Sequence, residues 1–149
     1  MRVWAYEVLK NCAGLAPYVG APGPTQRIFL SEGISKAPRD NKGAVQPYIL
    51  YRFGNTSPDN RLHTARRQYL TVYCCDSAAP GDYLQIDSML SEVVKAYAAA
   101  APYPAEHILE CRWLESSSDQ DDREMGVILR YARFQIVRAQ WEPGALIGE

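Results

Sequence analysis

Residues Arg66–Tyr97, RRQYLTVYCCDSAAPGDYLQIDSMLSEVVKAY, predict a strand, a tight turn and a helix that follow one another directly. In Gln68–Cys75, side chains alternate with the period of two that a strand shows, and β-branched and aromatic residues suit a pleated surface. One side of the strand would carry Leu70, Val72 and Cys74, and the other Tyr69, Thr71 and Tyr73. We therefore expect a strand with an apolar side and a tyrosine-rich side.

The second half of this stretch predicts a capped amphipathic helix. Ala79–Gly81 would end the strand, and the Asp82 carboxylate would accept hydrogen bonds from the first amides of the helix. Gln85, three residues further on, would reach back as in a capping box. The helix would begin near Tyr83, and its apolar residues recur at steps of three and four. They are Tyr83, Ile86, Leu90, Val93, Val94 and Tyr97.

The length and composition of the chain indicate one globular domain, residues 1–149. A chain of 149 residues can bury a single core, and 47% hydrophobic with 22% charged residues argues against intrinsic disorder. No apolar run approaches the ~18 residues of a membrane span, and the first residues lack the apolar core of a secretory signal. We expect no membrane contact and a protein that stays where it is made. The net charge of −1 gives no global reason to bind nucleic acid phosphates.

Signatures of metal or catalytic chemistry are missing from the sequence. The four cysteines, Cys12, Cys74, Cys75 and Cys111, form no C-x-x-C pair, so buried reduced thiols are favoured over a metal site or a disulfide. The common phosphate-loop, zinc-protease and serine-hydrolase motifs do not occur. We therefore expect no cofactor and no enzyme activity, and we interpret His63 and His107 as surface histidines.

The remaining segments predict an α+β fold. We expect helices over Arg2–Ala13, ended by a left-handed Gly14, and over the stretch after Asp82, which together cover one face of a mainly antiparallel, four- to five-stranded sheet. The other face would carry Tyr, Arg and Gln side chains, which favours a subunit partner there. The strands would be Arg27–Leu30, Pro47–Phe53, Gln68–Cys75, His107–Glu115 and Gly126–Gln140. The loops would be Leu15–Gln26, Ser35–Gln46, Gly54–Ala65 and Ser116–Arg123, and residues 141–149 would form an irregular tail.

Two groups of polar residues are candidates for contacts with partners. The first group lies at the entry to the strand after residue 65 and suits a subunit or partner interface, although such arginines can also contact phosphates or aid solubility. It consists of Arg61, His63, Arg66, Arg67 and Tyr69. The second group is an acidic loop whose spacing departs from a calcium-binding loop, so a solvated hairpin is favoured. It consists of Asp119, Asp121, Asp122 and Glu124.

From Pro47 to Ile136 the chain resembles the tail terminator, or tail completion, proteins of long-tailed bacteriophages. The resemblance rests on PYILYRF from Pro47, a turn-rich loop, ARRQYLTVY from Ala65, the helix Asp82–Tyr97, and an acidic loop before RYARFQIV from Arg130. It implies a non-enzymatic ring, commonly a hexamer, that caps the tail tube in the virion after assembly in the host cytoplasm. The implied neighbours are the tail tube protein and a head-tail connector or stopper protein.

In such a ring the acidic loop could face the channel through which DNA passes without specific binding. Carboxylates at the lumen would repel the phosphate backbone and keep transit free. A hairpin tip chosen only for solubility explains the same residues equally well.

Two other classes of protein remain as alternatives. A small nucleic-acid-binding α+β module could use the tyrosine-rich sheet face for base stacking, but the aromatic signature of such modules is absent and the net charge is near zero. A small hydrolase would need paired carboxylates of perturbed pKa in a pocket, which a hydrophilic loop does not offer.

Overall fold

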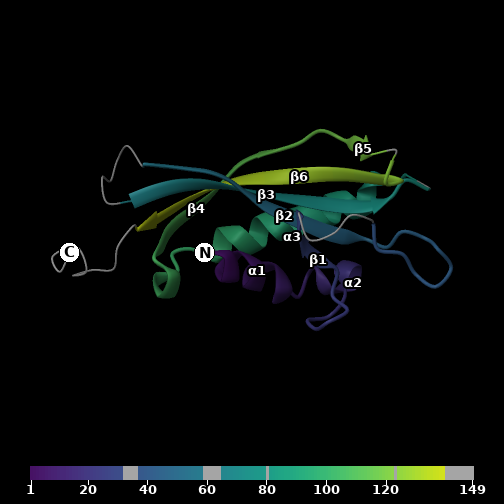
Figure 1. The fold of residues 1–149 in the computed structure, drawn as a ribbon, viewed down its shortest axis with the longest axis horizontal. Coiled ribbons are helices and arrows are strands. Elements are labelled where there is room, and N and C mark those ends of the chain that lie inside the picture. Colours follow the sequence, from purple (N-terminus) through teal and green to yellow (C-terminus); the bar gives the residue numbers. More distant parts are fainter. Residues whose placement is uncertain (32–36, 59–64, 80, 123, 140–149) are drawn as a thin grey trace.

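The computed structural model describes residues 1–31, 37–58, 65–79, 81–122 and 124–139. The described helices lie on one side of a β-sheet, and the opposite side carries no helix from this part of the chain (Figure 1). The helices are α1 (Arg2–Lys10), α2 (Ala16–Val19), α3 (Tyr83–Ala99) and the 3-10 helix η2 (Pro104–Glu106). The strands are β1 (Ile28–Leu30), β2 (Tyr48–Pro58), β3 (Ala65–Ser77), β4 (Ile108–Ser116), β5 (Gln120–Asp122) and β6 (Val127–Ala139).

The sheet is mixed and has six strands in the described part of the chain. Its order is β1-β2-β3-β6-β4, with β5 pairing to β6, and only the β1–β2 pair is parallel. The α+β class is therefore confirmed. The predicted numbers of strands, four to five, and of helices, two, were both too low. The segments that form β5 and α2 had been predicted as loops.

Two predicted loops contain strands because a neighbouring strand supplies their hydrogen-bond partners. β2 continues through a bulge between Phe53 and Thr56 to Pro58, so the predicted loop Gly54–Ala65 is wrong for its first five residues. Residues 59–64 of that loop lie outside the described part. The predicted loop Ser116–Arg123 is wrong at β5, which extends the edge begun by β4 along β6. Turn-forming residues joined the sheet because long partner strands were available.

The first helices differ from prediction at their ends. α1 is confirmed, but it ends at Lys10 with Asn11 as its C-cap, and Gly14 is not among the glycines of positive φ. A Cβ at Gly14 would instead collide with the Glu92 side chain of α3, so the glycine allows a close approach. α2 lies within a segment predicted as a loop, and its Pro17 stands in the first turn, where proline is tolerated.

The turn before α3 is held by side chains of Asp82 and Asp76. As predicted, the Asp82 carboxylate caps the helix, accepting from the Leu84 amide at 2.9 Å. The predicted capping box is wrong, because Gln85 donates to Oδ2 of Asp76 at 3.2 Å instead. Gln85 thus ties the helix to the end of β3.

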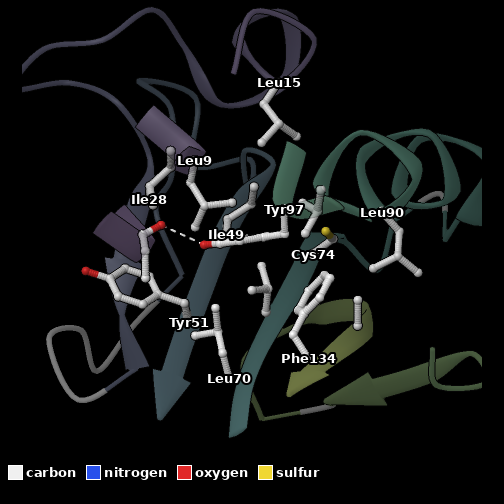
Figure 2. Packing of buried hydrophobic residues seen from close by; sticks show 14 of the residues in the cluster. Leu9, Leu15, Ile28, Ile49, Tyr51, Leu70, Cys74, Leu90, Tyr97 and Phe134 are labelled. Atoms are coloured by element: carbon white, nitrogen blue, oxygen red, sulfur yellow. Dashed lines mark hydrogen bonds between the residues drawn. The ribbon is translucent and has the colours of Figure 1, made fainter. Parts of the chain in front are cut away.

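The main core fills the space between the helices and the sheet. At its centre, Tyr97 donates from its hydroxyl to the Ala5 carbonyl at 2.6 Å and so joins α3 to α1 (Figure 2). Its ring packs against Trp4 at 5.5 Å and Phe134 at 4.9 Å between centroids. The buried residues of α3 are Ile86, Met89, Leu90, Val93 and Tyr97, while Tyr83 and Val94 are half-buried. The predicted helix face is confirmed, with Met89 added to it.

The cysteines are free thiols, as predicted, but only two of them are fully buried. Cys74 faces the main core, and Cys75 points to the opposite face of β3. Cys12 and Cys111 are half-buried.

Replacement of Leu90 by alanine should destabilise the domain by about 2–5 kcal/mol, because Leu90 is only 5% exposed and truncation leaves a cavity in the core. Chemical denaturation measures the change. Leu84 lies on the same helix but is 73% exposed, so Leu84→Ala is the matched control and should change stability by less than ~0.5 kcal/mol. Equal effects of the two substitutions would contradict the orientation of α3.

Alkaline pH should destabilise the fold through two thiols. Burial raises the pKa of Cys75 and of Cys111 from 9.0 to about 12. The unfolded chain therefore loses these protons first, and each thiol favours unfolding as the pH rises from 9 towards 12, by up to ~1.4 kcal/mol per pH unit. Urea unfolding from pH 7 to 11 measures this fall in stability. The variant Cys75→Ala/Cys111→Ala should show a shallower fall, and an unchanged slope would contradict the assignment.

Candidate interface on the open face of the sheet

The sheet face that turns away from the helices, which we call the open face, has buried side chains at its two ends within the described part of the chain. At one end Ala37 and Val45, from the segment before β2, pack with Tyr48, Cys75 and Val127 in a second small core. At the other end of β6, Gln135 and Val137 are also buried. The middle of the open face lies between these two covered regions.

A hollow of about 530 Å³ occupies this middle region, and we call it the Arg–Tyr hollow. Side chains of β2, β3 and β6 line it because strand register places them opposite one another: Arg52 faces Thr71, which faces Arg133, and Tyr73 faces Tyr131. The full lining is Arg52, Gly54, Asn55, Tyr69, Thr71, Tyr73, Tyr131 and Arg133. Its volume is within the ~300–1,000 Å³ range of ligand pockets.

The tyrosines of the hollow are held by neighbouring side chains. The Arg133 guanidinium lies 4.6 Å from the centroid of the Tyr69 ring, in cation–π contact, and is 3.4 Å from Oε1 of Glu115. Tyr73 and Tyr131 pack with centroids 5.5 Å apart and ring planes at 59°. The aromatic groups therefore form a fixed wall rather than separate exposed rings.

Positive charge on the open face exceeds the carboxylates available to it. Register places Arg52, Arg67, Arg112 and Arg133 on this face, together with Glu110, Glu115 and, at one end, Asp122. Within the described part of the chain, exposed Arg52 makes no hydrogen bond or ion pair. Nε of Arg67 is buried and has no acceptor there. Among the described residues, the open face therefore presents the Arg52 guanidinium without a counter-charge.

The predicted interface group does not stay together in the structure. Arg67 and Tyr69 lie on the open face. Arg66 faces the helix side, where it lies opposite Arg138 in the strand register and near Met1. Neighbouring residues of a strand point to opposite faces, so Arg66 and Arg67 cannot share one surface. Arg61 and His63 lie outside the described residues.

Asp121 and Asp122 lie on β5, Asp119 directly precedes this strand, and Glu124 lies in the turn that follows it. Asp119 is 62% exposed and 3.8 Å from Nε of Arg130, and Oδ1 of Asp122 accepts from the Met125 amide at 3.2 Å. The Tyr83 hydroxyl donates to the Gln120 carbonyl at 2.8 Å, which ties β5 to the start of α3. Asp121 and Glu124 are exposed. The four carboxylates are therefore presented on a supported edge strand and directly beside it, and we call this group the acidic edge.

Ser117 fixes the passage from β4 to the acidic edge. Its amide donates to the Tyr131 carbonyl at 2.8 Å, and its hydroxyl accepts from the Tyr131 amide at 2.9 Å. The side chain thus takes the place of a backbone acceptor where the β4–β6 ladder is interrupted.

Sequence reasoning missed Arg52, Tyr73, Tyr131 and Arg133 as members of one site. The alternation of β6 did place Tyr131 and Arg133 away from the core, and this was the available signal. Their meeting with β2 and β3 depends on strand register, which the sequence alone does not determine.

The described residues contain no group of three or more His, Cys, Asp or Glu side chains that could hold a metal ion. His107 is half-buried with φ 60° at the end of η2. No helix of the described residues has the length and apolarity needed to cross a membrane. Comparison of the chain with protein family models and with curated proteins gave no match.

Replacement of Ser117 by alanine should cost about 1–3 kcal/mol, because the Tyr131 amide loses its acceptor in a half-buried position. It should also raise hydrogen exchange at residues 120–122. Ser118 is exposed and contributes only its carbonyl to this contact, so Ser118→Ala is the control and should leave both quantities unchanged. The same exchange rates in both variants would show that Ser117 does not hold β5.

Proposed function

We propose that this protein is a structural ring subunit of the tail terminator type, which caps a phage tail tube and joins it to a head-proximal connector or stopper protein. The observation that carries the proposal is the open face, with its Arg–Tyr hollow opposite the helical layer. Tyrosine and arginine are enriched in the centres of protein interfaces. A sheet face of this composition suits burial against another protein subunit.

Ring formation needs a contact between two different surfaces that repeats by rotation until the ring closes. The chain offers such different surfaces: the open face, and the edge made by β4 and the acidic edge. β4 also exposes Leu109 and Trp113, which are 44% and 50% exposed. These features support association without any catalytic group, so the proposed role is not enzymatic.

In the proposed ring, DNA would pass through the lumen without specific binding. The channel-facing position of the acidic residues stays a prediction; these are Asp119, Asp121, Asp122 and Glu124. The location of the protein in the virion also stays a prediction. The tail tube protein is the proposed neighbour on one side of the ring and the connector on the other.

Nucleic-acid binding is the second candidate, and the three tyrosines of the hollow are the observation that favours it. Stacking platforms need ring faces that bases can reach. Here Tyr73 and Tyr131 pack against each other, and Arg133 covers Tyr69. This arrangement favours a protein partner over unpaired bases.

Light scattering coupled to size-exclusion chromatography should give a mass near that of a hexamer of the 16.7 kDa chain. Arg67→Glu should weaken assembly by at least about tenfold, because it reverses a charge on the open face. Arg66→Glu is the matched control, since this neighbouring arginine faces the helix side. Circular dichroism verifies that both variants are folded.

A monomer that shifts short RNA in electrophoresis would contradict the ring and support the nucleic-acid-binding module. Equal assembly of the two arginine variants would remove the open face from the interface.

A further inference from the structure

We infer that the Arg–Tyr hollow of one copy binds the acidic edge of a second copy. This inference rests on the proposed ring function and specifies which two surfaces of the chain meet in it. The contact pairs guanidinium groups of the hollow with Asp119, Asp121 and Glu124 of the neighbouring subunit. Aspartate and glutamate are the natural partners of arginine, which can bind a carboxylate through two parallel hydrogen bonds.

The hollow provides the positive half of the contact. Arg52 is exposed at its rim and has no ion-pair partner in the described part of the chain. The Arg133 guanidinium stacks on the Tyr69 ring, and the side chain is 41% exposed. It can therefore bind a second carboxylate in addition to that of Glu115. The Arg133 guanidinium is held before binding by the Tyr69 ring and Glu115. This reduces the conformational entropy lost on association.

The acidic edge provides the negative half. Asp121 stands on a strand paired to β6, and Asp119 and Glu124 flank that strand. The Tyr83 hydroxyl and Arg130 give further support to this region. Nη1 of Arg130 in turn donates a hydrogen bond of 2.6 Å to Oδ1 of Asp87 in α3, which fixes the arginine. The acidic edge is therefore a supported projection whose charges oppose those of the hollow.

The two surfaces lie at different places on the sheet. β5 lies beside β6 (Figure 1) and pairs with Val127–Leu129 at its start. The hollow is lined by later residues of β6, Tyr131 and Arg133, and by residues of β3 and β2. The contact is therefore made between copies, and each copy keeps one hollow and one acidic edge for its two neighbours. Such a head-to-tail contact can repeat around a ring.

Charge reversal tests the contact from both sides. Arg52→Glu, and separately Asp121→Lys/Glu124→Lys, should each weaken self-association at least about tenfold at low salt. Asp119 and Asp122 are left unchanged because they contact Arg130 and the Met125 amide. On α1, away from the contact, Arg2→Glu carries the same charge change as Arg52→Glu, and Glu7→Lys carries half the charge change of the acidic-edge variant with the same sign. Both should assemble as the unmodified chain does. Sedimentation velocity measures assembly, and circular dichroism verifies folding.

Mixing the two reversed variants should restore assembly. In an alternating ring, the intact acidic edge of the Arg52→Glu chain would meet an intact hollow. The lysine-bearing edge of its partner would meet the glutamate in the altered hollow. The chain that combines all three substitutions should also assemble alone.

The association of the unmodified chain should weaken as salt rises from about 0.05 to 0.5 M, because screening shortens the range of the charges.

The outcomes separate the two levels of the proposal. If the unmodified chain forms a ring and the reversed variants form it equally well, the contact is wrong, while the ring function stands and the carboxylates are free to face the channel. Variants that fail to assemble, and are not restored by mixing, would also overturn the contact. A monomeric unmodified chain would overturn both, and RNA binding lost in Arg52→Glu would assign the hollow to nucleic acid.

Discussion

The antiparallel pairing of β3 with β6 is the constraint on which the rest of the structure depends. It extends from Ala65 opposite Ala139 to Ser77 opposite Val127 and joins segments separated by α3 and β4. Since side chains alternate along both strands, this one register divides the molecule into a helix-facing side and an open side. Val72 and Ala132 enter the main core together, and Tyr73 meets Tyr131 on the opposite face. A slip of one residue would exchange the two faces.

Local sequence patterns were sufficient for the elements whose hydrogen bonds or packing are local. The period of α3 and its Asp82 cap identified that helix, and the alternation around Leu70 identified the centre of β3. Local patterns failed where a distant strand determined the outcome. Gly54–Pro58 and β5 consist of turn-forming or acidic residues, yet each is held in the sheet by a long partner strand. The candidate site was only partly predicted for the same reason, because the register that brings Arg52, Thr71 and Arg133 together is not encoded in any one segment.

The two faces of the sheet are covered to different extents by the described residues. On the helix side, α1 and α3 are tied across the core by the hydrogen bond from Tyr97 to Ala5, and large apolar side chains fill the layer. On the open side, among the described residues, a short segment with Ala37 and Val45 covers one end, and Gln135 and Val137 are buried at the other. The Arg–Tyr hollow remains between the covered ends, and its aromatic wall is already packed. An arginine-bearing surface of this kind gains from a partner that brings carboxylates, because the guanidinium groups then exchange water for charge-assisted hydrogen bonds.

The acidic edge also affects how two sheets can meet. An exposed edge strand offers unpaired backbone groups to any other strand, and charged side chains are a common means of preventing such pairing. Asp121 and Asp122 place carboxylates along β5 and Asp119 places one just before it, so close edge-to-edge approach of two copies at this point would bring like charges together. The same carboxylates are attracted to a surface that carries arginine. Charge at the edge therefore disfavours open-ended strand addition and favours a side-chain contact with a different face, which is the type of contact that a closed ring needs.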